Sequence, residues 1–474
     1  MNNRDRCGVF TRAVFTAARA LAISASLSLL AQDAGEQTKD KAKPMDHSHM
    51  DHSQMKGDAN QDMSGMKDMP GMDSGKAMNE AGTFLMGESS GTAFQPSAWP
   101  MPMLMNHVGD WSLMWMGQAF LVDTQQAGSP RAGDKFYSTN WGMLSAQHQV
   151  GKGSVMLRGM MSLEPATVTN REYPLLFQTG ETAFGKPIVD GQHPHDLFME
   201  LSIQYAHPLS EKGTWNAYYA PVGEPALGPI AYPHRASAME LPQAALSHHW
   251  QDSSHIANNV FTAGISYAKV RIEASGFYGR EPDENRWNID FGRMDSWSTR
   301  FSVFPTKNWS GQISVGRLRN PEQAHPGDVV RTTASVHYIR PAANENWWAG
   351  SLVWGQDHKV AENRTVNAVL GEAVVPIRRK NFITGRYEWS QRDELFENDH
   401  ALADLLESRT GQAAFKVNAF TLGYTRDIPV FRNVQSGLGF NITTYAIDEV
   451  LKPYYGAHAW GVNLFARFRL KAAH

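Results

Sequence analysis

The stretch Gly461–Leu470, GVNLFARFRL, alternates between two kinds of side chain near the end of the chain. Every second position from Val462 to Leu470 is apolar, and the positions between them are Asn463, Phe465, Arg467 and Arg469. A helix would mix the two sets around its circumference, whereas a strand places alternate residues on opposite faces. The stretch therefore predicts a β-strand whose two faces meet different surroundings.

The same period of two returns along most of the chain after Trp111. In VRIEASGFYG (residues 270–279) Arg271, Glu273 and Ser275 alternate with apolar positions, and FKVNAFTLGYT (residues 415–425) repeats the pattern. Period two over eight to twelve residues is the signature of strands. We predict sixteen strands, near residues 111–122, 136–150, 153–163, 196–208, 213–221, 258–268, 269–279, 296–305, 308–317, 329–340, 346–355, 366–377, 380–390, 411–425, 433–446 and 458–470.

Tight polar turns, such as PTKNWS (residues 305–310) and PIRRKN (residues 376–381), join several of these segments, and longer loops join others. Short turns on one side and long loops on the other are typical of outer-membrane barrels. Lipid offers no partner to backbone amides, so such a sheet has to close. The sequence thus predicts an all-β fold, a transmembrane antiparallel β-barrel of about sixteen strands over residues 111–474. A soluble array of β-sandwiches is the alternative.

Paired aromatic residues near strand ends favour the barrel over the sandwich. The pairs are Trp347 with Trp348, Tyr218 with Tyr219, and Tyr454 with Tyr455. Aromatic girdles mark both interfaces of a membrane-spanning barrel. We therefore expect these pairs to lie at the membrane interfaces.

Residues 1–31 have the features of an export signal. Four arginines within the first nineteen residues precede the apolar run LAISASLSLLA, which is too short to serve as a membrane anchor. We expect this signal to send the chain to the outer membrane of a Gram-negative bacterium and to be removed. Cys7 is the only cysteine, so the exported protein would have no thiol for a disulfide, a zinc site or catalysis.

Residues 45–78 combine methionine and histidine in MDHSHMDHSQM and MSGMKDMPGMDSGKAM, with almost no aliphatic residue. Such a composition cannot bury enough apolar surface to fold, so residues 32–80 are predicted to be disordered, followed by a connector at 81–110. Thioethers and imidazoles without thiols form a donor set for Cu(I), Cu(II) or silver; a tolerated linker is the alternative. The candidate ligands are His47, His49, Met50, His52, Met55, Met63, Met66, Met69 and Met72.

Two long loops, at residues 164–196 and 222–257, carry a second set of candidate copper ligands. VDGQHPHDLFME places His193 and His195 on either side of a proline that keeps the backbone extended. AYPHRASAMELPQAALSHHWQDSSH contains His248 and His249. Loops of this length in a barrel fold over its mouth or into its lumen. The alternative role for these four histidines is hydrogen bonding inside a wet pore.

An exported Met/His-rich segment followed by a barrel resembles the copper-resistance outer-membrane proteins of Gram-negative bacteria, the copper resistance protein B class. The likeness rests on MDHSHMDHSQM, MSGMKDMPGM and the strand pattern after Trp111. It implies copper binding at the cell surface or at the periplasmic face, with export or sequestration as the outcome. Outer-membrane lipid and periplasmic copper carriers are the expected partners.

The sequence predicts a role in copper tolerance, with a general outer-membrane pore or small-solute channel as the alternative. An H-E-x-x-H motif and a phosphate-binding loop are absent from the sequence, and no catalytic triad stands out, so we do not expect an enzyme. The net charge of −3 does not favour a nucleic-acid partner.

Overall fold

A computed structural model describes residues 78–340, 348–378 and 380–471. The predicted signal peptide and the Met/His-rich segment up to residue 77 lie outside the described residues. Sixteen described strands form one antiparallel barrel. In chain order they are β2 (Trp111–Ala127), β3 (Asp134–Val150), β4 (Gly153–Met161), β7 (Phe198–Ser210), β8 (Gly213–Gly223), β9 (Ala257–Tyr267), β10 (Val270–Tyr278), β11 (Ser296–Thr306), β12 (Trp309–Leu318), β13 (Val329–Arg340), β14 (Trp348–Lys359), β15 (Arg364–Ile377), β16 (Asn381–Arg392), β17 (Phe415–Asp427), β18 (Val434–Ile447) and β19 (Trp460–Leu470).

The remaining elements lie in loops and at the N-terminal side. The strands are β1 (Leu104–Val108), β5 (Tyr173–Ala183) and β6 (Lys186–Gln192). The helices are α2 (Glu80–Met86), α3 (Glu164–Thr167), α4 (His248–Gln251), α5 (His400–Thr410) and α6 (Lys452–Tyr455), with short 3-10 turns η2 (Thr169–Arg171), η3 (Tyr232–His234), η4 (Ala236–Ala238), η5 (Ser253–His255) and η7 (Glu449–Leu451). None of the helices in the described ranges has the length and apolar character needed to cross a bilayer.

The sheet closes because β19, the last strand, pairs with β2, the first strand of the wall. Their register runs from Trp460 opposite Ala127 to Arg469 opposite Gln118. Where β19 stops, the short strand β1 takes over and pairs with the beginning of β2. The hairpin of β5 and β6 leaves the wall, so β4 pairs directly with β7.

Alternation along the strands separates a polar interior from an apolar exterior. In β10 the side chain of Arg271 is 1% exposed, while the neighbouring Ile272 is 62% exposed. In β19 Arg467 is fully buried, while Leu464 is 48% exposed. Strands that bury arginine and expose aliphatic residues have lipid outside and a polar lumen inside. This pattern confirms the predicted barrel and excludes the sandwich alternative.

The predicted aromatic girdle is wrong for two of its members. Tyr218 is 1% exposed and lies inside the barrel, while its neighbour Tyr219 is 37% exposed. Adjacent residues of a strand point to opposite faces, so only one of such a pair can reach lipid. Tyr455 is fully buried in α6 and stacks on Phe177, with ring centroids 4.4 Å apart. Trp347 lies outside the described residues.

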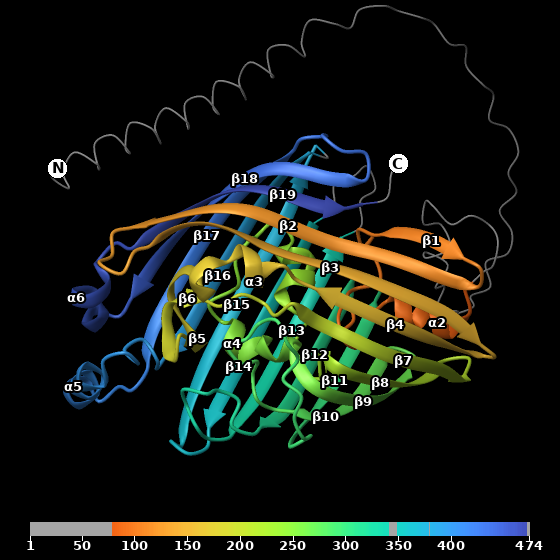
Figure 1. Cartoon of the computed structure of the whole chain (residues 1–474), viewed down its shortest axis with the longest axis horizontal. Coiled ribbons are helices and arrows are strands. Elements are labelled where there is room, and N and C mark those ends of the chain that lie inside the picture. The colour runs from red at the N-terminus through yellow and green to blue at the C-terminus, as the bar shows by residue number, and fades with distance from the viewer. Residues whose placement is uncertain (1–77, 341–347, 379, 472–474) are drawn as a thin grey trace, which may run out of the picture. The chain divides into compact units, whose positions relative to one another are not determined.

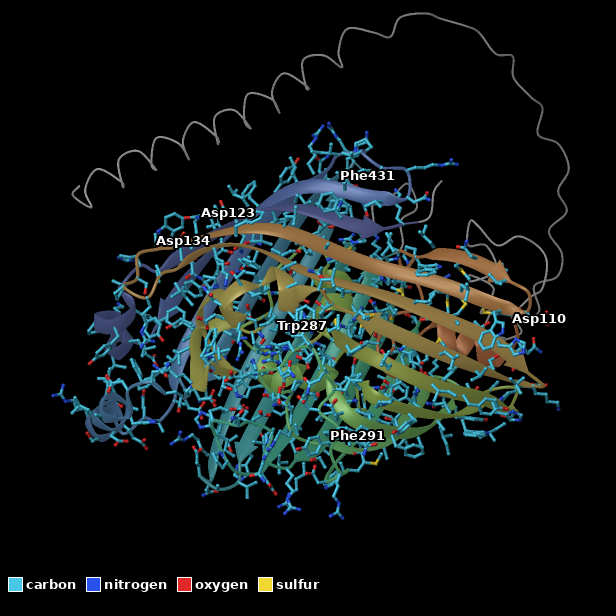
Figure 2. All side chains as sticks on the ribbon, viewed as in Figure 1. Asp110, Asp123, Asp134, Trp287, Phe291 and Phe431 are labelled. Atoms are coloured by element: carbon cyan, nitrogen blue, oxygen red, sulfur yellow. The ribbon has the colours of Figure 1, made fainter. Side chains whose placement is uncertain are left out.

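The loops at the two ends of the barrel differ in length. Turns of two residues join β3 to β4, β7 to β8, β9 to β10 and β11 to β12 at one end. The long loops, with α5 and α6, lie at the other end, and α2 and β1 lie near the short turns (Figure 1). Asp110, before β2, and Asp134, at the start of β3, mark these two ends (Figure 2). Short turns face the periplasm in barrels of this kind.

Two chain segments enter the lumen from opposite ends and meet there. We call residues 79–100 the N-terminal insert and residues 224–256 the loop insert. At the short-turn end, the Asn79 side chain donates to the Gly153 carbonyl (3.1 Å). Deeper in the lumen, the Ser90 hydroxyl donates to Glu224 (2.5 Å) and the Gln95 amide donates to the His234 carbonyl (2.6 Å). The predicted connector at 81–110 therefore contains α2 and β1 and fills part of the lumen.

Candidate metal-handling site in the lumen

Five imidazoles, four of them fully buried, form a continuous row where the two long loops meet. Neighbouring ring centroids lie 5.2 to 5.5 Å apart in the order His193, His249, His248, His255 and His195. We call this row the histidine chain. It brings together the four predicted loop ligands, which come from the segment after β6 and from α4. His255 belongs to the same sequence block but was not among the predicted ligands.

Local backbone geometry sets the direction of these rings. The chain turns through Pro194 between His193 and His195, just after β6 ends at Gln192. On the other loop, the single turn of α4 starts with His248 and His249, so the two rings diverge. Gly180 packs directly on the His249 ring, where a Cβ atom would lie only 2.5 Å from the nearest ring carbon. Glycine is therefore required at this contact.

Hydrogen bonds hold four of the five rings through their Nδ1 atoms. The partners are Glu164 for His195 (3.0 Å), Asp252 for His248 (2.7 Å), the backbone carbonyl of Asp252 for His255 (2.7 Å) and the Pro194 carbonyl for His193 (3.1 Å). The alternative role as structural hydrogen-bonding groups thus holds in part. The Nε2 atom of His255 and both ring nitrogens of His249 have no hydrogen-bond partner among the described residues. An acceptor that holds one nitrogen fixes the ring so that the other faces a metal.

Burial decides the charge of most of the histidine chain. It lowers the pKa of His193, His249 and His255 well below the ordinary value, because a buried imidazolium loses its hydration. Burial also lowers the pKa of His195, but the attraction of the adjacent Glu164 carboxylate is larger, so the pKa of that ring is raised. Neutral imidazole is the form that binds metal ions. Three of the rings are therefore in the binding form at neutral pH.

A second set of donors, all methionines, lines the lumen between the short-turn end and the histidine chain. They form two apolar clusters that share Met116. We call the set the methionine wall; it comprises Met78, Met86, Met101, Met103, Met105, Met114, Met116, Met143, Met156, Met160 and Met199. The second cluster also contains Ile256, the neighbour of His255. The wall thus extends from Met78 to the strand residues that pack against Ile256.

Strand register explains part of the methionine wall. Met116 of β2 lies opposite Met143 of β3, which lies opposite Met160 of β4. Side chains opposite one another on neighbouring strands are in contact, so these three thioethers form a row across the sheet. The sequence contained a signal for part of the methionine wall, since methionines at 101, 103 and 105 and at 114 and 116 recur with the period of a strand. Sequence reasoning missed it because the methionines after residue 78 were not considered as ligands.

The predicted ligands of the Met/His-rich segment, from His47 to Met72, all lie outside the described residues. Their role in copper binding therefore stays a prediction.

Solved structures similar to this chain are outer-membrane proteins. The anion-selective porin from Comamonas acidovorans is 10% identical, with 76% of this chain and 100% of that chain covered and a TM-score of 0.46. OmpF of Salmonella typhi, in a complex with daunomycin, is 10% identical with 77% and 100% covered and a TM-score of 0.47. OprB of Pseudomonas putida at high pH is 10% identical with 76% and 94% covered and a TM-score of 0.49. No protein-family model and no curated protein matches the sequence.

This chain is an outer-membrane β-barrel. That conclusion rests on the closed sheet, the lipid-facing aliphatic residues and the polar lumen.

Proposed function

We propose that this barrel is a copper channel that serves copper tolerance, closed to bulk solutes in the conformation described here. The observation that carries the proposal is the presence of two rows of metal donors in one lumen. The methionine wall begins at Met78 near the short turns, and the histidine chain lies where the two long loops meet. Neutral donors in series offer an ion successive weak sites, which permits movement instead of storage.

The donor types favour copper over other ions. Thioether sulfur binds Cu(I) and keeps its affinity at any pH because it carries no proton to lose, and imidazole binds both Cu(I) and Cu(II). Ordinary packing is the other role of buried methionine, which fills irregular space well. The sequence argues against packing alone, because methionine is also concentrated in the Met/His-rich segment that directly precedes the wall.

In this proposal the Met/His-rich segment collects copper at the periplasmic side and passes it to Met78 and the wall. Periplasmic copper carriers would supply the ion. Removing residues 45–77 should lower copper tolerance of cells while the barrel still folds. Unchanged tolerance with normal barrel levels would remove the segment from the proposal.

A general small-solute channel is the second candidate. Porins with a similar number of strands surround an aqueous channel, and the lumen of this barrel is polar. The two inserts occupy that lumen, however, and are bound to each other through Ser90 and Glu224. A general channel would therefore require the inserts to move apart.

The deciding experiment measures ion entry into vesicles that contain the purified full chain. We compare wild type with the triple variant Met116→Leu, Met143→Leu and Met160→Leu, which removes three sulfur atoms at nearly constant volume. The matched control is Met161→Leu, whose side chain is 44% exposed on the lipid side. We expect silver, as a stable substitute for Cu(I), to enter at least tenfold more slowly with the triple variant and at wild-type rate with the control.

Vesicle swelling in a neutral sugar separates the two candidate functions. A general channel would admit sugar readily, and it would admit silver equally well with and without the three methionines. That result would contradict the copper proposal.

A further inference from the structure

Three side chains from three different loops converge at the long-loop end of the lumen. His249 comes from α4, Glu281 from the loop between β10 and β11, and Glu322 from the loop between β12 and β13. Each offers one ligand atom, and these atoms lie within 4.8 Å of one another. The residues are far apart in the sequence, so no sequence motif contains all three.

The three side chains lack the partners that buried polar groups normally have. His249 is 4% exposed, and neither of its ring nitrogens has a hydrogen-bond partner among the described residues. The same holds for both carboxylate oxygens of Glu281 and for one of Glu322. His249 Nδ1 lies 4.0 Å from a Glu281 oxygen. Buried donors and acceptors without partners are rare, and several aimed at one point indicate a missing ligand.

The two cationic side chains close to these glutamates, Arg331 and Lys359, are paired with other carboxylates. The nearby Arg331 pairs with Asp357 (2.7 Å) and Lys359 pairs with Asp393 (2.8 Å). Neither Glu281 nor Glu322 forms an ion pair with arginine or lysine in the described ranges. A bound cation would relieve both carboxylates.

We propose that His249, Glu281 and Glu322 form a binding site for one divalent transition-metal cation of the zinc or manganese type. One imidazole nitrogen and two carboxylate oxygens are borderline-to-hard donors, unlike the soft thioethers of the methionine wall. The neighbouring group of Glu322, His325 and Glu394 also lies within 4.8 Å. It is a weaker candidate because His325 already faces Glu397 (3.4 Å) and Glu394 already pairs with Lys359.

A cavity lies beside the two loops that carry Glu281 and Glu322. This cavity of about 600 Å³ is lined by Gln323, the neighbour of Glu322, and by Asp283, two residues from Glu281. Trp287, which is 52% exposed, also lines the cavity and is labelled in Figure 2. The site goes beyond the proposed copper channel, since an ion that joins three loops stabilises the barrel whether or not anything crosses it.

Thermal unfolding of the purified full chain with Zn²⁺ tests the site. Glu281→Gln combined with Glu322→Gln keeps the shape of both side chains and removes their charge. We expect zinc to raise the unfolding temperature of wild type and not that of the double variant, while the variant without metal is at least as stable as metal-free wild type. A zinc titration should show one equivalent fewer bound to the variant than to wild type. Any zinc bound by the Met/His-rich segment is the same in both proteins and cancels in this comparison.

His234→Gln is the matched control, since His234 is also buried in the lumen with both ring nitrogens unpaired but belongs to no converging group. It should bind zinc as wild type does. Equal zinc stoichiometry and equal stabilisation of wild type and the double variant would overturn the site. Silver entry into vesicles is measured on the same variant, so loss of zinc binding with normal silver entry separates this site from the copper channel.

Discussion

Single ion pairs fasten the loop insert to the barrel wall. The carboxylate of Glu372, on β15, lies between Arg235 of the insert (2.6 Å) and Arg386 of the wall (2.9 Å), and all three side chains are buried. Glu372→Ala would leave two buried guanidinium groups without their carboxylate. We expect a loss of about 3–5 kcal/mol in the free energy of unfolding, measured by urea titration in lipid vesicles.

Glu362→Ala supplies the comparison for this prediction. Glu362 pairs with Arg364 (3.1 Å), but its side chain is 38% exposed. An exposed ion pair contributes about 0–1 kcal/mol, so the stability of this variant should barely change. Equal losses in the two variants would mean that Glu372 does not fasten the insert.

At the scale of elements, the junction of the two inserts should respond to pH. Burial raises the pKa of Glu88 to about 7 and that of Glu224 to about 8, although arginines oppose both shifts. The groups that face the two carboxyls are Arg158, Arg271, Glu273 and Gln204 for Glu88, and Arg300, Ser90, Glu200 and Asp252 for Glu224. Because both pKa values lie above the unfolded value of 4.5, the folded junction binds more protons than the unfolded chain.

This stabilisation is therefore complete below pH 4.5 and is lost as the pH rises through 7 and 8. We expect the free energy of unfolding to fall between pH 5 and pH 9, and to fall less in a variant with Glu88→Gln and Glu224→Gln. Urea titrations at several pH values measure both slopes. Identical slopes in wild type and variant would assign the pH dependence to other groups.

The strands were predictable from the sequence because period two is a local property, and it appears unaltered in β10 and β19. The entry of the loop at 222–257 into the lumen was also expected from its length. The N-terminal insert and the contact between the two inserts were not, because they join distant residues such as Ser90 and Glu224. The two histidine blocks were recognisable one at a time, but their meeting depends on how both loops fold into one lumen. Glu281 and Glu322 gave no signal at all, since each is an isolated acidic residue in a polar loop.

At the scale of the whole molecule, the position of a residue on the lipid-facing surface determines how much an introduced arginine lowers the free energy of unfolding. Leu422 lies in the middle of β17 and is 66% exposed. Leu422→Arg should reduce the free energy of unfolding in vesicles by about 2–4 kcal/mol, since the guanidinium would enter the bilayer midplane. Leu209→Arg is the control: Leu209 is 59% exposed but lies beside a short turn, where arginine costs about 0–1 kcal/mol. Similar costs at both positions would contradict the assigned depth of β17.

The pairing of β19 with β2 has a consequence for biosynthesis. The strand that seals the wall is the last to be synthesised, and its partner is the first. Until β19 meets β2, the edges of both strands present unpaired backbone groups. A variant that ends before Trp460 would lack the sealing strand, and its open edges would be prone to aggregation.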